Sequence, residues 1–221
     1  RNNKMTAANF YQRIQQETAA EREYLLSSPL ITSALTGNLT LDEYISFLAQ
    51  AYHHVKHTTP LLMAVGSRIP ESQEWLRDKI AHYIEEEVGH QEWILNDIRH
   101  CGGDAEAVRA DIPLLPVELM ISYIWDFVSR RNPVGFFGMV YVLEGTSVNV
   151  ATHAADKVRE CLGLPKNAFS YLYSHGSLDI EHIDFFEGIV NRIDDPKDQA
   201  DIIHVAKIIF RLYADMFRAL K

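Results

Sequence analysis

Apolar residues recur every three or four positions along most of this chain, which is the spacing of one face of an α-helix. The expected helices cover 6–26, 29–36, 41–66, 72–100, 116–131, 133–160, 168–193 (or 174–193) and 196–221. We find no strictly alternating apolar and polar run, bounded by turn dipeptides, that would indicate a β-strand. The pattern therefore predicts an all-α bundle of seven or eight helices.

Glycine and proline mark the ends of most of these segments. They cluster at a few places, such as Gly37-Asn38, Gly102-Gly103 and Asn132-Pro133, and both residue types interrupt helices. Thr40 and Glu43 have the spacing of a capping box, which predicts that a helix begins at residue 41. Pro60 lies inside the segment 41–66 and is expected to kink it.

The composition suits one folded domain. The 221 residues, 47% of them hydrophobic, are enough to bury a core without disulfides, so a single domain spanning 1–221 is expected. Residues 1–5 are expected to be disordered or foreign to the domain. With 30 acidic and 21 basic residues the net charge is −9, which argues against nucleic acid or a membrane as partner. The chain has no signal-like apolar start, and we expect a cytoplasmic protein.

The segment 174–193 carries ionisable residues on its apolar face. At 100° per residue, His175, Asp179 and His182 fall in line with Phe186 and Ile193. Three potential metal ligands therefore share one face over two turns. The alternative is a polar helix end, or a His–Asp pair satisfied by hydrogen bonds within the core.

Glu144 interrupts the apolar stripe of the segment 133–160. A lone buried carboxylate is costly unless it is neutralised, paired or bound to a cation. Metal ligation and an ion pair with an arginine of another helix are both compatible with this position.

Glu87 and His90 lie near the apolar side of the segment 72–100. Their i, i+3 spacing lets two side chains reach one metal or two adjacent metals. Glu86 lies slightly farther from the apolar face, and Glu85 is expected to face solvent. Gly89 lowers the helix propensity by up to about 1 kcal/mol relative to alanine, so close packing is expected there.

Other polar residues carry weaker signals. His53 and His57 share a face just before Pro60 and are expected either to line the central pocket or to be hydrogen-bonded core residues. Cys101 and Cys161 lack a neighbouring His or Asp that would indicate a nucleophile.

Together, three helices present three carboxylates and three imidazoles to the bundle interior. That ligand set in a helical bundle is typical of a non-haem di-iron or di-manganese site. Three carboxylates nearly balance two divalent cations, whereas a zinc ion needs three or four ligands. The residue types do not distinguish iron from manganese.

The motifs EEEVGHQEW, YVLEGTS and HGSLDIEHIDFFE, in this order, resemble the haem-oxygenase-like superfamily. That superfamily includes haem oxygenases, TenA thiaminases, PqqC, and iron-containing oxidases and oxygenases related to CADD and UndA. The spacing His-x3-Asp-x2-His at 175–182 resembles the last of these, the di-iron branch. The resemblance implies two ligand sets, one of Glu87, His90 and His175 and one of Glu144, Asp179 and His182. Some members place the first carboxylate seven residues before the histidine, where this chain has Tyr83, and Glu86 is the other candidate for that ligand.

The resemblance implies a non-haem di-iron oxidase or oxygenase that uses O2 to oxidise a small organic substrate at the bundle centre. Two irons per chain are expected, with manganese as the alternative metal. The other interpretations are a TenA-like hydrolase acting on an aminopyrimidine, and a non-enzymatic ligand-binding or interaction protein on the same scaffold. The amphipathic outer helices are also compatible with a homodimer.

Overall fold

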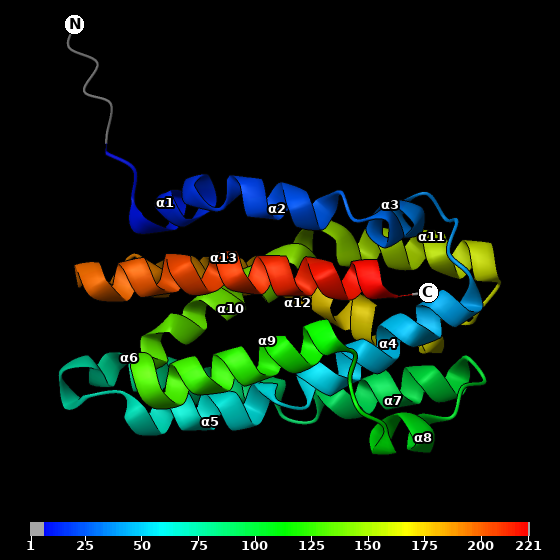
Figure 1. Cartoon of the computed structure of the whole chain (residues 1–221), viewed down its shortest axis with the longest axis horizontal. Coiled ribbons are helices and arrows are strands. Elements are labelled where there is room, and N and C mark those ends of the chain that lie inside the picture. The colour runs from blue at the N-terminus through cyan, green and yellow to red at the C-terminus, as the bar shows by residue number, and fades with distance from the viewer. Residues whose placement is uncertain (1–6, 221) are drawn as a thin grey trace, which may run out of the picture.

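The computed structural model describes residues 7–220, without the side chains of 177–180. Its helices lie side by side along the long axis of the molecule (Figure 1), which confirms the prediction of an all-α single domain. The α-helices are α1 (Phe10–Glu17), α2 (Ala19–Leu26), α3 (Pro29–Leu35), α4 (Leu41–Val55), α5 (Thr58–Arg68), α6 (Glu74–Glu87), α7 (His90–His100), α8 (Ala105–Ala110), α9 (Leu115–Asp126), α10 (Phe136–Thr146), α11 (Thr152–Leu162), α12 (Ser170–Val190) and α13 (Pro196–Ala219).

The expected seven or eight helices are too few. When segments that continue one another without a loop are joined, about ten or eleven helices remain among the described residues. The largest difference lies in the segment 72–100, which is two helices because Gly89 has a φ of 89°. This left-handed conformation suits glycine and ends the first helix at Glu87.

The segment 41–66 is also divided. The predicted capping box of Thr40 and Glu43 is present at the start of α4. The break lies at Lys56 and His57 rather than at Pro60, which occupies the first turn of α5. A proline ring collides with the carbonyl group four residues earlier, so the α-helix ends at residue 55 and restarts where proline is tolerated.

The segment 133–160 runs through the centre of the bundle as one continuous helix. It comprises α10, a π-helical turn η4 (Ser147–Ala151) and α11. From Pro133 to Leu162 it is long and apolar enough to cross a membrane, but 61% of its most apolar window is buried by the rest of the protein. Burial of this kind is typical of the core helix of a globular bundle.

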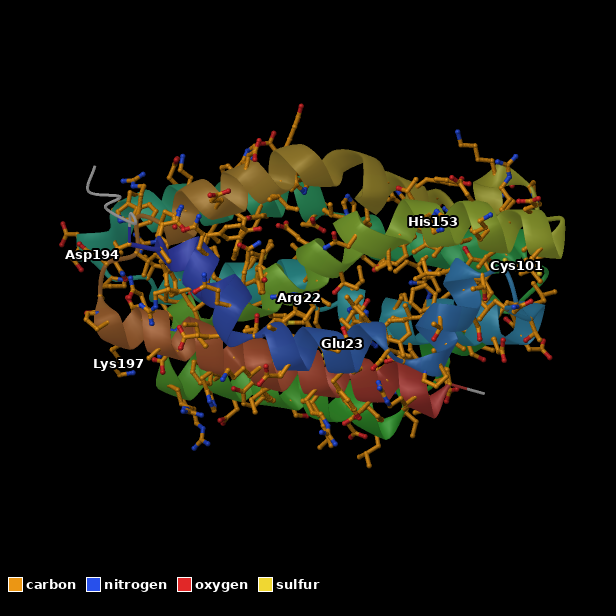
Figure 2. All side chains as sticks on the ribbon, turned by 90° about the horizontal axis from the view of Figure 1, so that it is seen from above. Arg22, Glu23, Cys101, His153, Asp194 and Lys197 are labelled. Atoms are coloured by element: carbon orange, nitrogen blue, oxygen red, sulfur yellow. The ribbon has the colours of Figure 1, made fainter. Side chains whose placement is uncertain are left out.

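Polar contacts fix the helices around this centre. Asp97 of α7 is fully buried, and its carboxylate accepts hydrogen bonds from the backbone N–H groups of Ser170 (3.0 Å) and Tyr171 (2.9 Å) at the start of α12. On the other side, Arg22 of α2 points toward α10 (Figure 2) and donates to the hydroxyl of Tyr141 at 2.9 Å. These contacts hold α7 against α12 and α2 against α10.

Gly138 in α10 provides a test of this packing. A Cβ atom there would collide with the backbone of α13 at the carbonyl oxygen of Ile202 and the amide nitrogen of Ala206. We expect Gly138→Ala to destabilise the fold by about 1–3 kcal/mol, the usual cost of overpacking. Gly145 of the same helix has no atom within 4 Å of an added Cβ. The control Gly145→Ala should therefore be neutral or stabilising in urea unfolding, and equal losses in both variants would contradict the close approach of α10 and α13.

Candidate metal centre

Glu87 and His90 meet across the junction between α6 and α7. Glu87 is the last residue of α6 and His90 the first of α7, so the turn at Gly89 sets their separation. The Oε2 atom of Glu87 lies 3.0 Å from Nδ1 of His90, and the two side chains are 12% and 6% exposed. Burial acts to raise the pKa of Glu87, but the hydrogen bond with His90 and the neighbouring imidazoles of His175 and His182 outweigh it and lower the pKa below its usual value.

Helix α12 brings two histidines to this junction. One group of candidate metal-binding residues is Glu87, His90 and His175, and a second is Glu87, Glu144 and His182. Within each group the ligand atoms lie within 4.8 Å of one another. Glu87 belongs to both, so the described side chains form two overlapping ligand sets that share one carboxylate.

One ring nitrogen of His175 is buried among the candidate ligands. Its Nε2 atom is buried and has no hydrogen-bond partner among the described residues. Burial lowers the pKa of His175 to about 4, with Glu87 acting in the opposite direction. The side chain is therefore a neutral imidazole, the form that binds metals.

Glu144 projects from α10 toward His182 of α12. Its Oε1 atom lies 3.8 Å from Nδ1 of His182, and the Glu144 side chain is 15% exposed. Glu144 thus lies in one of the two groups of candidate metal-binding residues.

Glu86 lies behind His182 and outside both ligand sets. One of its oxygens is 2.9 Å from Nε2 of His182 and the other is 3.1 Å from Nε2 of the more exposed His82. Glu86 is 32% exposed, compared with 12% for Glu87. The two neighbouring carboxylates thus occupy different positions: Glu87 among the candidate ligands and Glu86 on the outer side of His182.

The remaining predicted site residues differ in how close they lie to these candidate ligands. Asp179 lies on α12, and its side chain falls outside the described residues. Tyr83 is buried beside the site, and its hydroxyl has no hydrogen-bond partner among the described residues. His53 is buried and contacts Tyr52, whereas His57 accepts a hydrogen bond from Nε1 of Trp125 at 3.1 Å.

A cavity of ≈ 70 Å³ adjoins the candidate ligands, and we call it the metal-side cavity. Its lining includes Glu87, Glu144, His175 and His182, together with His54 of α4. His54 was not singled out in the sequence, because a histidine between two others in a polar stretch carries no periodic signal of its own. It is 2% exposed, and burial lowers the pKa of His54 to about 3.

The donor set fits a metal of intermediate hardness. Carboxylate oxygens and imidazole nitrogens are the ligands that iron and manganese take in helical bundles, and the buried Nε2 atom of His175 has no other partner in the described part of the chain. Neither cysteine lines this cavity. Cys101 lies toward one end of the molecule (Figure 2), and burial raises the pKa of its thiol to about 11.

Comparison with solved structures places the fold among haem-oxygenase-like proteins. A haem-oxygenase-like domain of unknown function from Shewanella denitrificans matches with a TM-score of 0.83 and 22% identity, over 96% of this chain and 91% of that one. A TenA homologue from Pseudomonas syringae matches with a TM-score of 0.79 and 12% identity, over 96% and 91%. A CADD-like protein of unknown function from Nostoc punctiforme matches with a TM-score of 0.73 and 14% identity, over 96% and 95%.

The family of the protein follows from a comparison of its sequence with protein families. Residues 45–214 match the model of a family described as iron-containing redox enzymes, and the chain belongs to that family. No curated protein sequence matches the chain. The family and the resemblance to haem-oxygenase-like proteins agree with the expectation from the three motifs, and the matched region contains every candidate ligand.

The burial of His54 predicts an acid-sensitive fold. Because the folded pKa is about 3 and the ordinary value is 6.5, the unfolded chain takes up this proton first as the pH falls. The contribution of His54 to stability is complete above pH 6.5 and is lost as the pH falls toward 3. Between pH 7 and 5 the loss is roughly 2 kcal/mol. Urea unfolding of the metal-free chain should show a shallower pH dependence in His54→Gln, and an unchanged slope would contradict the burial.

Proposed function

We propose that this protein is a non-haem di-iron oxidase or oxygenase that uses O2 to oxidise a small organic substrate in the bundle centre. The observation that carries the proposal is the pair of ligand sets that share Glu87. A carboxylate common to two sets suits a bridge between neighbouring cations, as in other helical-bundle carboxylate sites. Membership of an iron-containing redox family supports iron as the metal.

The residues divide between two metal positions. Glu87, His90 and His175 would hold one iron, and Glu144 and His182 the other, with Glu87 reaching both. Asp179 completes the second set in this proposal because it shares a helical face with His175 and His182. Reduced iron in such a site supplies the capacity to activate O2.

The protein's own contribution is ligand orientation and exclusion of water. Asp97 fixes the first turn of α12, and so the direction in which His175 and His182 project. The apolar side chains of Leu61, Leu62 and Phe136 form much of the wall beside the ligands. Because these apolar side chains exclude water, they strengthen the electrostatic interaction of the carboxylates with a bound cation.

The TenA-like alternative lacks its nucleophile in the described structure. Such a hydrolase needs a reactive cysteine in the pocket, but neither Cys101 nor Cys161 lines the metal-side cavity. The raised pKa of Cys101, caused by burial, keeps its thiol protonated at neutral pH. No observation favours hydrolysis over oxidation.

Metal content tests the proposal. The chain loaded anaerobically with Fe(II) and desalted should contain two irons, measured by a ferrozine assay, and admission of O2 should produce a transient visible absorption band. Glu87→Ala should lose both irons because Glu87 belongs to both sets, whereas Glu144→Ala should retain about one. Glu85→Ala changes an exposed neighbour and should retain two. A wild-type chain that takes up no iron, or a Glu87→Ala variant that keeps both, would overturn the proposal.

We expect Glu86 to affect metal affinity through its contact with His182. The carboxylate of Glu86 lies 2.9 Å from Nε2 of His182, and loss of such a partner to a ligating histidine usually costs about 10–100-fold in metal affinity. We therefore expect Glu86→Gln to weaken Co(II) binding by about 10–100-fold in competition titrations, while Glu85→Gln leaves it unchanged. Equal affinities in the two variants would assign Glu86 to the solvated surface alone.

A further inference from the structure

A second cavity lies beside the metal-side cavity. This apolar cavity, of ≈ 80 Å³, extends between α3, α4, η4, α11, α12 and α13, and its walls include Leu30, Ile31, Phe47, Val158 and Phe217. The two cavities share Ser147, Tyr171, His175 and Tyr213 as lining residues. The apolar cavity is therefore adjacent to the cavity that contains the candidate ligands.

The charges along this space are confined to its metal end. The described residues that line the apolar cavity include no Asp, Glu, Lys or Arg. Those that line the metal-side cavity include Glu87 and Glu144 but no Lys or Arg. An anionic group of a bound molecule would lose its hydration in either cavity without gaining an ion pair from a lysine or arginine, and a cationic group would compete with a bound metal for Glu87 and Glu144.

His54 is a buried polar group in this space that makes no hydrogen bond with the described residues. It lines the metal-side cavity and is 2% exposed. Neither Nδ1 nor Nε2 has a hydrogen-bond partner among the described residues, and the ring packs edge-on against Tyr213 with centroids 5.7 Å apart. Buried polar atoms are nearly always hydrogen-bonded, so the position points to a partner that enters the cavity.

The chemistry of that partner follows from the imidazole and the walls. A neutral imidazole offers one donor and one acceptor, which complements a hydroxyl or amide group that can both accept and donate. The rest of the molecule must suit the apolar cavity. We infer that the two cavities form one substrate chamber for an uncharged, largely hydrocarbon molecule, whose single hydroxyl or amide group is bound by His54 beside the ligands.

This inference names the substrate class of the proposed oxidase and rests on that function for its chemical outcome, but the binding itself requires no metal. The chamber would place the polar end of the substrate, and the carbon atoms next to it, against the side of the cavity formed by Glu87, Glu144, His175 and His182. His54 is then a substrate-orienting residue.

Calorimetric titration of the metal-free chain with 1-octanol and with octanoate tests the chamber. We expect 1-octanol to bind at least tenfold more tightly than octanoate. His54→Phe, which keeps an aromatic ring and removes the hydrogen bonds, should weaken 1-octanol at least tenfold. The matched control is His53→Phe, because His53 is also 2% exposed but does not line either cavity, and it should leave the affinity unchanged.

A second variant keeps the test decisive if His54→Phe does not fold. Ala154 is half-buried and lines the apolar cavity, so Ala154→Leu should weaken 1-octanol about tenfold and leave the shorter 1-butanol unaffected. Equal loss of both alcohols would overturn the two-cavity chamber. Octanoate binding as tightly as 1-octanol, to the metal-free or the iron-loaded chain, would overturn the uncharged class.

The outcomes separate the two proposals. If the protein binds 1-octanol but takes up no iron, the substrate chamber is supported and the proposed oxidase function is contradicted. If the protein takes up two irons but binds no 1-octanol, the metal centre is supported and the substrate chamber is contradicted.

Discussion

The close approach of two carboxylates, Glu87 and Glu144, is the constraint on which the interior of this bundle depends. Both are largely buried, and both belong to a group of ligand atoms that lie within 4.8 Å of one another. Two negative charges at that separation repel strongly when water is displaced. Divalent cations, as in the proposed metal centre, would relieve this repulsion and would account for acidic residues at positions where apolar ones would stabilise the helices better.

The backbone creates this arrangement through a break in a helix. Were 72–100 continuous, Glu87 and His90 would project from one straight surface. The left-handed conformation of Gly89 instead redirects the chain, so that α6 ends on Glu87 and α7 begins with His90. Asp97, two turns further along α7, then binds the first turn of α12. One short stretch of chain thus supplies two candidate ligands and fixes the helix that carries two more.

The sequence could predict what depends on period and spacing. The helical class, the approximate extent of most segments and the inward side of α12 all follow from where apolar residues recur, and the family agrees with the three motifs. The break at Gly89 was beyond this reasoning, because a glycine inside a helical pattern is compatible with close packing as well as with a left-handed turn. Sequence periodicity also could not decide between Glu86 and Glu87 as the ligand. Adjacent helical residues differ by 100°, and only the position of α12 determines which of the two faces His175.

His54 was missed for a related reason. Periodicity shows which side of a helix is buried, but it does not show whether a buried polar atom meets a partner or a cavity. That distinction depends on how α4, α12 and α13 pack, with His54 against Tyr213 and in the same cavity as His175. Long-range packing of this kind leaves no local pattern in the sequence.

The π-helical turn η4 contributes lining residues to both cavities. It follows Glu144 by three residues, and its Ser147 lines both cavities, whereas Val150 and Ala151 line the apolar one. A π-turn inserts a residue into the helical register and leaves backbone carbonyls without their usual partners, and such turns are frequent at functional sites. Here the hydroxyls of Thr146 and Ser147 donate to the carbonyl oxygens of Val142 and Leu143, at 2.6 and 2.9 Å. The altered register lets one continuous helix direct a carboxylate at the candidate metal centre and then, within two turns, present small apolar side chains to the adjoining cavity.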